Sequence, residues 1–209
     1  MLYNFMFNMV VRMTSRVYVG TPLCRDREWL AMIEDHPKLM FAITAALKKW
    51  PSYLRPLVAR FIQPKKRLDA YRQQLHEKLD PLIEQRRKYC ELPKAERPLD
   101  MLQWLVDTCK GREATNDNII SKLMFLNLAA LNTTASSLTQ TIMELCHRRE
   151  YIAPLTEEVR QTLKEEGGWS ATALKRMQKL DSFMKETQRL NPQGYCKSHR
   201  GFRAQRTTK

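Results

Sequence analysis

The sequence predicts an all-α fold, and three observations support this. Apolar residues recur every three or four positions through most of the chain, which is the period of a helix that faces a core. No stretch of useful length alternates apolar and polar residues as a half-buried strand does. The 209 residues are 43% hydrophobic, which is enough for one well-packed domain but too little for two large ones.

Prolines, glycines and short polar loops separate the predicted helices. These helices are expected at residues 2–19, 25–48, 65–90, 99–106, 116–149, 154–166, 171–180 and 181–190. Pro37 predicts an irregularity in the second helix, and Pro81 predicts a kink or restart in the strongly charged third, which we expect at the surface. The fourth should pack Trp104 against the core, while Ser170 and Asp181 are the expected N-caps of the last two.

The other elements are organised around the helix predicted at about 116–149. No proline or glycine interrupts it, so it is on the order of 45–50 Å long and can cross a whole domain. Its first half is apolar on nearly every side, which is typical of a buried helix. The apolar residues are Ile119, Ile120, Leu123, Met124, Phe125, Leu126 and Leu128.

In the middle of this helix the side chains become small and hydroxylic. Residues 129–137 read AALNTTASS, where bulky side chains are expected. Small residues allow another group to approach the backbone closely, and Ser or Thr hydroxyls can bond to backbone carbonyls and bend a helix. This notch is either the floor of a pocket or a place where a core helix admits a crossing neighbour, and the helix alone favours the second interpretation.

Charge and cysteine content restrict the possible classes of protein. Lys and Arg outnumber Asp and Glu by 36 to 22, but the basic residues come in short bursts within amphipathic segments, so we expect solvated faces. The five cysteines are scattered and form no C-x-x-C pair, which argues against a disulfide framework or a zinc site and favours a reducing compartment. The apolar N-terminus is interrupted by polar and charged residues, so no membrane span or signal peptide is expected.

The end of the chain differs in composition from the rest. Residues 1–192 are expected to form one helical domain, which Asn191-Pro192 ends. Residues 193–209 have few apolar and many basic side chains, so we expect a divergent, disordered tail.

Several segments and their order point to one family. Glu186 and Arg189 lie one helical turn apart on an apolar helix. This spacing alone does not identify a family, because Glu84/Arg87 and Glu157/Arg160 repeat it. The other segments are SRVYVGTPLCRDREWL, FLNLAALNTT, EEGGW and KLDSFMKETQRLNP. With these motifs, residues from about 5 to 192 resemble the middle of a cytochrome P450, a haem-thiolate monooxygenase, and specifically the fungal ent-kaurene-oxidase-like branch of secondary metabolism.

The resemblance implies roles for the central helix. Thr133 would match the threonine that helps to deliver protons to bound oxygen, with Thr134 beside it. Asn132 falls where many relatives carry an acid, so this sequence has no carboxylate at that position to deliver protons. The positions that would face substrate or haem are Phe125, Leu126, Ala129 and Ala130. Glu186 and Arg189 would form the structural Glu-x-x-Arg pair that helps to lock the haem-binding core.

The resemblance also implies a function and a setting. A full-length relative would use haem and an NADPH-dependent reductase to oxidise a hydrophobic, terpenoid-like metabolite at the cytosolic face of the endoplasmic reticulum membrane. No nucleic-acid partner is expected. Without an anchor, this chain would be cytoplasmic or of unknown location.

The departures from the family pattern lead to a further expectation. The family's haem-ligating Cys lies in a Phe-x-x-Gly-x-x-x-Cys-x-Gly loop well after the Glu-x-x-Arg helix, and its thiolate favours O–O cleavage. Cys196 has no such surroundings and lies too close to Arg189, and the other cysteines precede that helix. We therefore expect a fragment of the helical domain, lacking the anchor, the sheet domain and the metal ligand, that is inactive and aggregation-prone alone. The tail reads as a premature end from a gene-model, splicing or frameshift artefact.

Proteins of three other classes were compared with this interpretation, and two of them, a nucleic-acid-binding protein and a non-catalytic interaction protein, remain as alternatives. A basic helical nucleic-acid-binding protein would use the net charge of +14, although aromatic residues are not interleaved with the basic ones. A helical terpene synthase would need an Asp-rich metal motif, which the sequence lacks. A non-catalytic interaction protein that pairs with a complementary polypeptide is the third.

Overall fold

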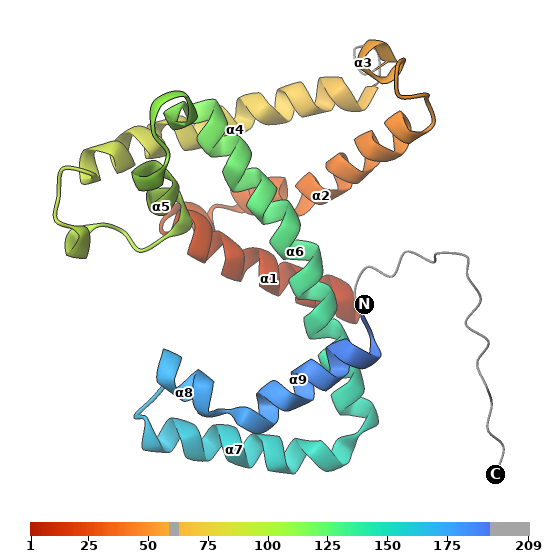
Figure 1. Ribbon diagram of the computed structural model, residues 1–209, viewed down its shortest axis with the longest axis vertical. Helices are drawn as coiled ribbons and strands as arrows, with labels where there is room; N and C mark the ends of the chain where they lie inside the picture. Colours follow the sequence, from red (N-terminus) through yellow and green to blue (C-terminus); the bar gives the residue numbers. More distant parts are fainter. Residues whose placement is uncertain (59–62, 193–209) are drawn as a thin grey trace. The chain divides into compact units, whose positions relative to one another are not determined.

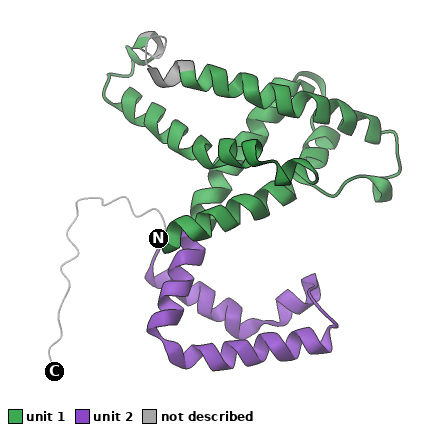
Figure 2. Ribbon diagram, turned by 180° about the vertical axis from the view of Figure 1, so that it is seen from behind, with its two compact units in different colours: residues 1–135 green, residues 136–209 purple. Residues whose placement is uncertain are grey.

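The computed structural model describes residues 1–58 and 63–192, and over these ranges it is all-α with no strand, which confirms the predicted fold class. The chain divides into two compact units, with the boundary between Ala135 and Ser136 (Figure 2). The boundary falls inside the central helix and inside the small-residue notch. We had expected a single partial domain over residues 1–192.

The first unit contains most of the helices labelled in Figure 1. Its elements are α1 (Leu2–Val19), η1 (Leu23–Arg25), α2 (Arg27–Lys48), α3 (Arg55–Val58), α4 (Gln63–Tyr89), η2 (Lys94–Glu96), α5 (Met101–Thr108), η3 (Gly111–Ala114) and the first part of α6 (Asn116–His147). The second unit contains the rest of α6 with η4 (Arg149–Tyr151), α7 (Ile152–Glu165), α8 (Ala171–Arg176) and α9 (Gln178–Leu190).

Two carboxylates both cap helices and join them to α4 in the first unit. The Asp26 carboxylate accepts hydrogen bonds from the backbone N–H groups of Glu28 and Trp29, which begins α2, and it also pairs with Lys78 of α4 at 2.8 Å. Asp100 caps α5 in the same way and pairs with Arg86 of α4 at 2.6 Å. The positions of α2 and α5 are thus tied to one helix.

The charged helix α4 is buried along one stripe, although its composition had predicted a surface helix. Tyr71, Leu75, Leu79 and Ile83 recur at every fourth position and are all buried. The helix continues through Pro81, so the restart expected there does not occur, and α2 likewise continues through Pro37.

Trp104 is a correction to the sequence prediction. Its neighbours Leu102, Gln103 and Leu105 on α5 are buried, whereas Trp104 is 58% exposed. The prediction was wrong because the core contacts the side of this short helix that Leu102 and Leu105 share, and Trp104 lies off that side.

The second unit has a different helix start from the one predicted. The helix expected at 171–180 breaks at Met177, and α9 begins at Gln178. Asp181 therefore lies inside α9, where it pairs with Lys185 at 2.6 Å, and it is not the cap. The Glu158 carboxylate of α7 instead accepts hydrogen bonds from the N–H groups of Lys179 and Leu180 at 2.8 and 2.9 Å. Ser170 caps α8 as predicted.

Within residues 1–58 and 63–192, no helix combines the length and the apolar character that crossing a membrane requires.

Candidate functional site

The notch of α6 presents small and hydroxyl-bearing side chains at the surface of the first unit. Ala129, Thr133 and Thr134 are exposed, and Ala130 is half-buried. The Thr133 hydroxyl donates to the backbone carbonyls of Ala129 and Ala130 at 2.8 and 3.2 Å. This is the local side-chain to backbone bonding expected for a threonine within a helix. The face is therefore open to a bulky group, and its hydroxyl proton is engaged with the helix itself.

Asn132 interacts with α1. The Tyr3 hydroxyl donates to Asn132 Oδ1 at 3.1 Å, and Asn132 Nδ2 is buried without a partner among the described residues. Nearby, the Tyr18 hydroxyl of α1 donates to the Leu126 carbonyl at 3.3 Å. Two tyrosines of α1 thus hold successive turns of α6, and Asn132 acts as a contact between these helices in this structure.

Phe125 belongs to the apolar first half of α6, which was expected to be buried, but its side chain is exposed. It is 69% exposed and lines a pocket of about 290 Å³ between α2, α4 and α6, within the first unit. Leu128 lines the same pocket, whereas Leu126 does not. The apolar body of the pocket is formed by Met40, Leu68, Tyr71, Leu75, Ile120, Met124, Phe125 and Leu128.

His36 of α2 lines this pocket, and the sequence analysis did not identify it. Only 6% of the residue is exposed, its ring stacks on Tyr71 at 5.4 Å between centroids, and its Nδ1 atom has no partner among the described residues. Burial lowers the pKa of His36, because the charged imidazolium is poorly solvated there, and contact with the Met124 backbone opposes this shift. His36 is therefore neutral near pH 7.

The polar end of the same pocket is an ion-pair cluster between α4 and α6. Arg72 Nη2 lies 2.8 Å from Asp117 Oδ1, and His76 contacts Asp80 and Asp117 at 3.1 and 3.5 Å. The Arg72 hydrogen bond holds the pKa of Asp117 below its usual value. The positive charge of Arg72 is already compensated, so this end offers no uncompensated cation.

In the second unit, Glu186 and Arg189 form the ion pair that their spacing predicts. Arg189 donates from Nε and Nη2 to the two oxygens of Glu186 at 2.7 and 2.6 Å, a bidentate geometry. The other copies of the motif are looser, at 3.7 Å for Glu84/Arg87 and 3.6 Å for Glu157/Arg160.

This ion pair is exposed to solvent. The Glu186 and Arg189 side chains are 53% and 68% exposed, so water screens their attraction. The hydrogen bond from Arg189 lowers the pKa of Glu186 and raises that of Arg189. The pair is well formed, but it is too exposed to stabilise the described fold by much.

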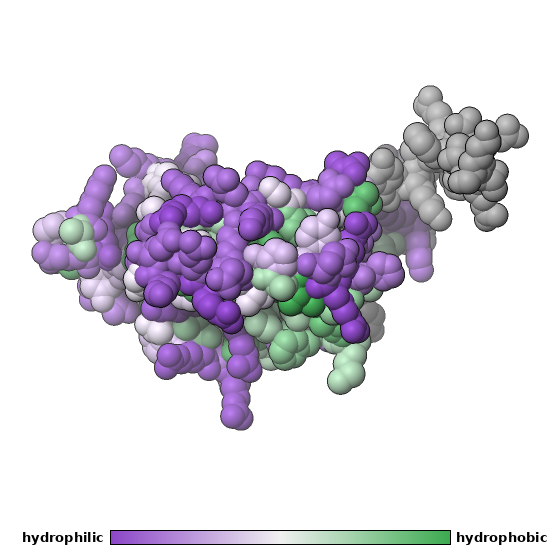
Figure 3. Space-filling model, turned by 90° about the horizontal axis from the view of Figure 1, so that it is seen from below, coloured by the Kyte–Doolittle hydropathy of each residue, from purple (hydrophilic) through white to green (hydrophobic). Residues whose placement is uncertain are grey.

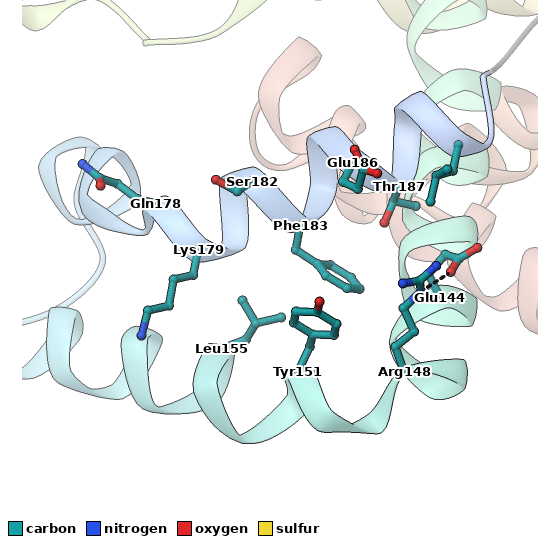
Figure 4. A pocket seen from close by; sticks show the side chains of 11 residues that line it. Glu144, Arg148, Tyr151, Leu155, Gln178, Lys179, Ser182, Phe183, Glu186 and Thr187 are labelled. Atoms are coloured by element: carbon teal, nitrogen blue, oxygen red, sulfur yellow. Dashed lines mark hydrogen bonds and ion pairs between the residues drawn. The ribbon is translucent and has the colours of Figure 1, made fainter.

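Glu186 also lines a pocket of about 520 Å³ between the end of α6, α7 and α9 (Figure 4). Its apolar surface includes Leu155 and the rings of Tyr151 and Phe183, whose centroids are 5.5 Å apart. Glu144 and Arg148 form an ion pair at one end, as the dashed line in Figure 4 shows. The sequence did not predict this pocket, because it needs three helices to be placed together.

The described cysteines do not fit a haem-thiolate ligand. Cys24 and Cys109 are buried in the first unit, and Cys146 is exposed on α6 in the second. Burial, and then the hydrogen bond to Asp107, raise the pKa of Cys90, which disfavours the thiolate. Cys196 lies outside the described residues. Within those residues no cluster of three or more His, Cys, Asp or Glu side chains could hold a metal.

Comparison with known proteins gives a family match along nearly the whole chain. The model of the family described as Cytochrome P450 matches residues 1–202, which extends past residue 192 into the expected tail. No solved structure matches.

Three fungal relatives illustrate the similarity. The cytochrome P450 monooxygenase olcJ of Penicillium canescens is 34% identical over 91% of this chain and 37% of its own length. The ent-kaurene oxidase of Gibberella intermedia is 34% identical over 90% of this chain and 34% of its own length. The cytochrome P450 monooxygenase ntnM of a Nectria species is 37% identical, with coverage of 90% and 36%. The chain thus spans about a third of the length of these relatives.

Proposed function

The chain belongs to the cytochrome P450 family, and from this premise we propose that it is the substrate-facing helical part of a haem-dependent monooxygenase that oxidises a hydrophobic, terpenoid-like secondary metabolite. The observation that carries this proposal is the continuity along α6. A largely apolar pocket lined by Phe125 and Leu128 is followed, one turn later, by the open small-residue face of Ala129 and Thr133. One helix thus offers an apolar binding wall next to a hydroxyl-bearing notch.

The relatives' names support the metabolite class. One similar protein is named ent-kaurene oxidase, which indicates that this protein oxidises ent-kaurene. By this similarity we propose an NADPH-dependent reductase as partner and the endoplasmic reticulum membrane as the setting of the longer enzyme. Thr133, Thr134 and Asn132 are the proposed proton-delivery residues, and Glu186 with Arg189 the proposed structural pair.

We also propose that residues 1–209 alone are inactive. The described cysteines do not fit a thiolate ligand, and a stripe of apolar side chains on one face of α1 is exposed to solvent. This stripe consists of Leu2, Phe5, Met9, Met13 and Val17, all more than a third exposed. A view of one face of the molecule shows hydrophobic side chains gathered beside hydrophilic ones (Figure 3). Such surface favours association.

A chimera tests the function without relying on the isolated chain. Residues 1–192 replace the matched segment of the Gibberella intermedia ent-kaurene oxidase, and the purified chimera is reduced under CO. We expect the Soret band typical of thiolate-ligated haem, and NADPH consumption stimulated by ent-kaurene when reductase is present. The matched variant Thr133→Ala keeps the band and loses about a hundredfold in product formed per NADPH consumed, the lower end of a general acid–base contribution. A folded chimera without the band contradicts the proposal.

A further inference from the structure

The first unit contains a further cavity at the C-terminal ends of α1 and α4, beside the loop that leads to α5. Its volume is about 570 Å³, which is within the usual range for small-molecule sites. It shares no lining residue with the pocket of Phe125 and Leu128. The proposed function therefore leaves this cavity without a role.

A buried ion pair forms part of the cavity wall. Arg86 Nη2 lies 2.6 Å from Asp100 Oδ2, and the two side chains are 6% and 5% exposed. The backbone of Gly20 comes close to this pair, since a Cβ atom there would lie 2.7 Å from Asp100 Oδ2. The charges of Arg86 and Asp100 compensate each other, so this wall is held in place and adds little net charge.

The other guanidinium in the wall, that of Arg16, has no counter-charge. Arg16 Nη1 donates to the Thr21 hydroxyl at 3.3 Å, and because Thr21 also lines the cavity, this bond places the guanidinium at the cavity's edge. Among the described residues no carboxylate pairs with Arg16. A guanidinium can hold a carboxylate through two parallel N–H···O bonds. Arg16 is therefore available to bind an anion.

Apolar side chains line the same cavity. Val17 and Leu99 are 58% and 104% exposed, and Leu82 and Tyr89 of α4 add partly buried surface. A ligand that covers these side chains removes apolar area from water, which favours binding. The ligand should therefore have an apolar body next to its anionic group.

The charges in the wall also limit the charge of the ligand. The charged residues that line the cavity are Arg16, Arg86 and Asp100. A second negative charge on the ligand would meet the Asp100 carboxylate and find no further uncompensated cation. A cationic ligand would be repelled by Arg16, and a neutral one would gain no charge-assisted hydrogen bond from it. The cavity therefore favours a monoanion.

We infer that this cavity binds a small organic monocarboxylate whose carboxylate pairs with Arg16 and whose apolar body covers Val17 and Leu99. The inference goes beyond the proposed function, because it assigns a second ligand class to a separate cavity. It also does not depend on that function, so the CO spectrum of the chimera and the binding measurements below can fail independently.

Three related probes test the inference: 3-phenylpropanoate, its neutral amide 3-phenylpropanamide, and benzylsuccinate, which carries a second carboxylate. Their affinities are measured by equilibrium dialysis at neutral pH on the 1–209 chain, Arg16→Gln, Arg12→Gln and Leu99→Ser. Arg12 is exposed one turn earlier on α1 and does not line the cavity, so Arg12→Gln removes the same charge outside the site. The Leu99 side chain is fully exposed, so Leu99→Ser leaves the core intact.

We expect Arg16→Gln to weaken binding of 3-phenylpropanoate about tenfold, the lower end for a hydrogen bond to a charged group. Binding of the amide should change less than about twofold, as should binding of every probe in Arg12→Gln. Leu99→Ser should weaken the acid and the amide by the same factor, about threefold, because both share the apolar body. Benzylsuccinate should bind no more tightly than 3-phenylpropanoate.

Several results would overturn the inference. These are equal losses of affinity in Arg16→Gln and Arg12→Gln, equal affinities of the acid and the amide for the unmodified chain, unchanged affinities in Leu99→Ser, tighter binding of benzylsuccinate, and no saturable binding of 3-phenylpropanoate.

A labelling measurement on the unmodified chain keeps the test valid if a variant does not fold. The photoreactive acid 4-benzoylphenylacetate is irradiated with the 1–209 chain, and the labelled peptides are identified by mass spectrometry. The label should appear in peptides that contain Val17 or Leu99, and excess 3-phenylpropanoate should suppress it more than the amide does. Label found only in other peptides, or equal suppression by acid and amide, overturns the inference.

Discussion

The two units of the chain differ in how their helices are held. The first unit buries large side chains completely, among them Trp29, Ile33, Leu79, Ile83, Leu102 and Leu123. It also buries polar contacts, such as the Trp29 indole N–H that donates to Ser15 at 3.2 Å. Among the described residues of the second unit, only Leu155, Ala173 and Met177 are buried hydrophobic side chains.

The second unit is instead held by caps and exposed ion pairs. Glu158 caps α9, and Arg176 pairs with Glu165 and Glu166 at the surface. Exposed pairs contribute little to stability. The first unit therefore has its own hydrophobic core. The second unit has few buried hydrophobic side chains, although its Glu186–Arg189 pair is well formed.

The largest expected effect is at the centre of the first unit. Trp29→Ala should lower the free energy of unfolding by about 3–5 kcal/mol, because it removes a fully buried aromatic ring and its hydrogen bond. Urea unfolding followed by circular dichroism measures the change. The matched variant Leu155→Ala in the second unit should cost less, about 2 kcal/mol. Equal losses of unfolding free energy in the two variants would contradict the conclusion that only the first unit has a well-packed core.

The buried ion pair of the first unit is expected to be nearly as sensitive. Asp100→Asn leaves Arg86 buried without its counter-charge, and the two side chains are only 5% and 6% exposed. The expected loss is about 3 kcal/mol. Asp35→Asn is the control, since its pair with Lys38 is 72% exposed on both sides and should contribute less than about 1 kcal/mol. A small effect at Asp100 would show that the pair is not needed by the fold.

In the second unit, the cap at Glu158 should have a moderate and local effect. Glu158→Gln weakens two bonds to the start of α9 and should cost about 1 kcal/mol. Hydrogen exchange should speed up at the amides of Lys179 and Leu180 and remain unchanged in α2. Glu157→Gln, on an exposed pair, is the neutral control. Unchanged exchange at both amides would mean that Glu158 does not cap α9 in solution.

Acid should weaken the first unit through His36. Its folded pKa lies below the ordinary value of 6.5, so the unfolded chain binds the proton more readily. The stability contributed by the neutral ring is complete above pH 6.5 and is lost as the pH falls below that value. His36→Phe should flatten the dependence of the unfolding free energy on pH between about 7 and 5. Parallel curves for both proteins would show that His36 is not buried in solution.

The smallest effect on the chain is expected at the Glu-x-x-Arg pair. Glu186→Gln should leave the unfolding of the 1–209 chain unchanged within error, because both side chains are mostly in water. In the chimera the same variant should reduce the haem retained after gel filtration, if the pair locks the haem-binding core as proposed. If the Glu186→Gln chimera retains as much haem as the Glu157→Gln control, the pair does not lock the haem-binding core.

Local signals in the sequence predicted most helix ends. Gly20 adopts a positive φ of 67° where α1 ends, and α9 ends just before Asn191-Pro192, as these residues indicate. The contact between Glu186 and Arg189 also followed from their spacing, because positions three apart share one helix face. Its bidentate geometry did not, since the same spacing leaves Glu84 and Arg87 3.7 Å apart.

Contacts between helices account for what the sequence did not predict. The buried stripe of α4 was masked by its many charged residues, although Leu75, Leu79 and Ile83 repeat every four positions. The cap of α9 comes from Glu158 on another helix, so no residue near Asp181 could reveal it. His36 is buried and lines a pocket because α2 packs near α4 and α6. Its neighbours in the sequence indicated only an irregularity at Pro37.

We proposed that these helices face the substrate in a longer haem-dependent monooxygenase, and that the cysteines among the described residues do not supply the haem thiolate. The most direct test is the CO spectrum of the reduced 1–209 chain after reconstitution with haem at low protein concentration. We expect no Soret band of the thiolate type, together with strong binding of a hydrophobic dye such as ANS. A monomer that shows this band, and loses it in Cys196→Ser, would contradict the account.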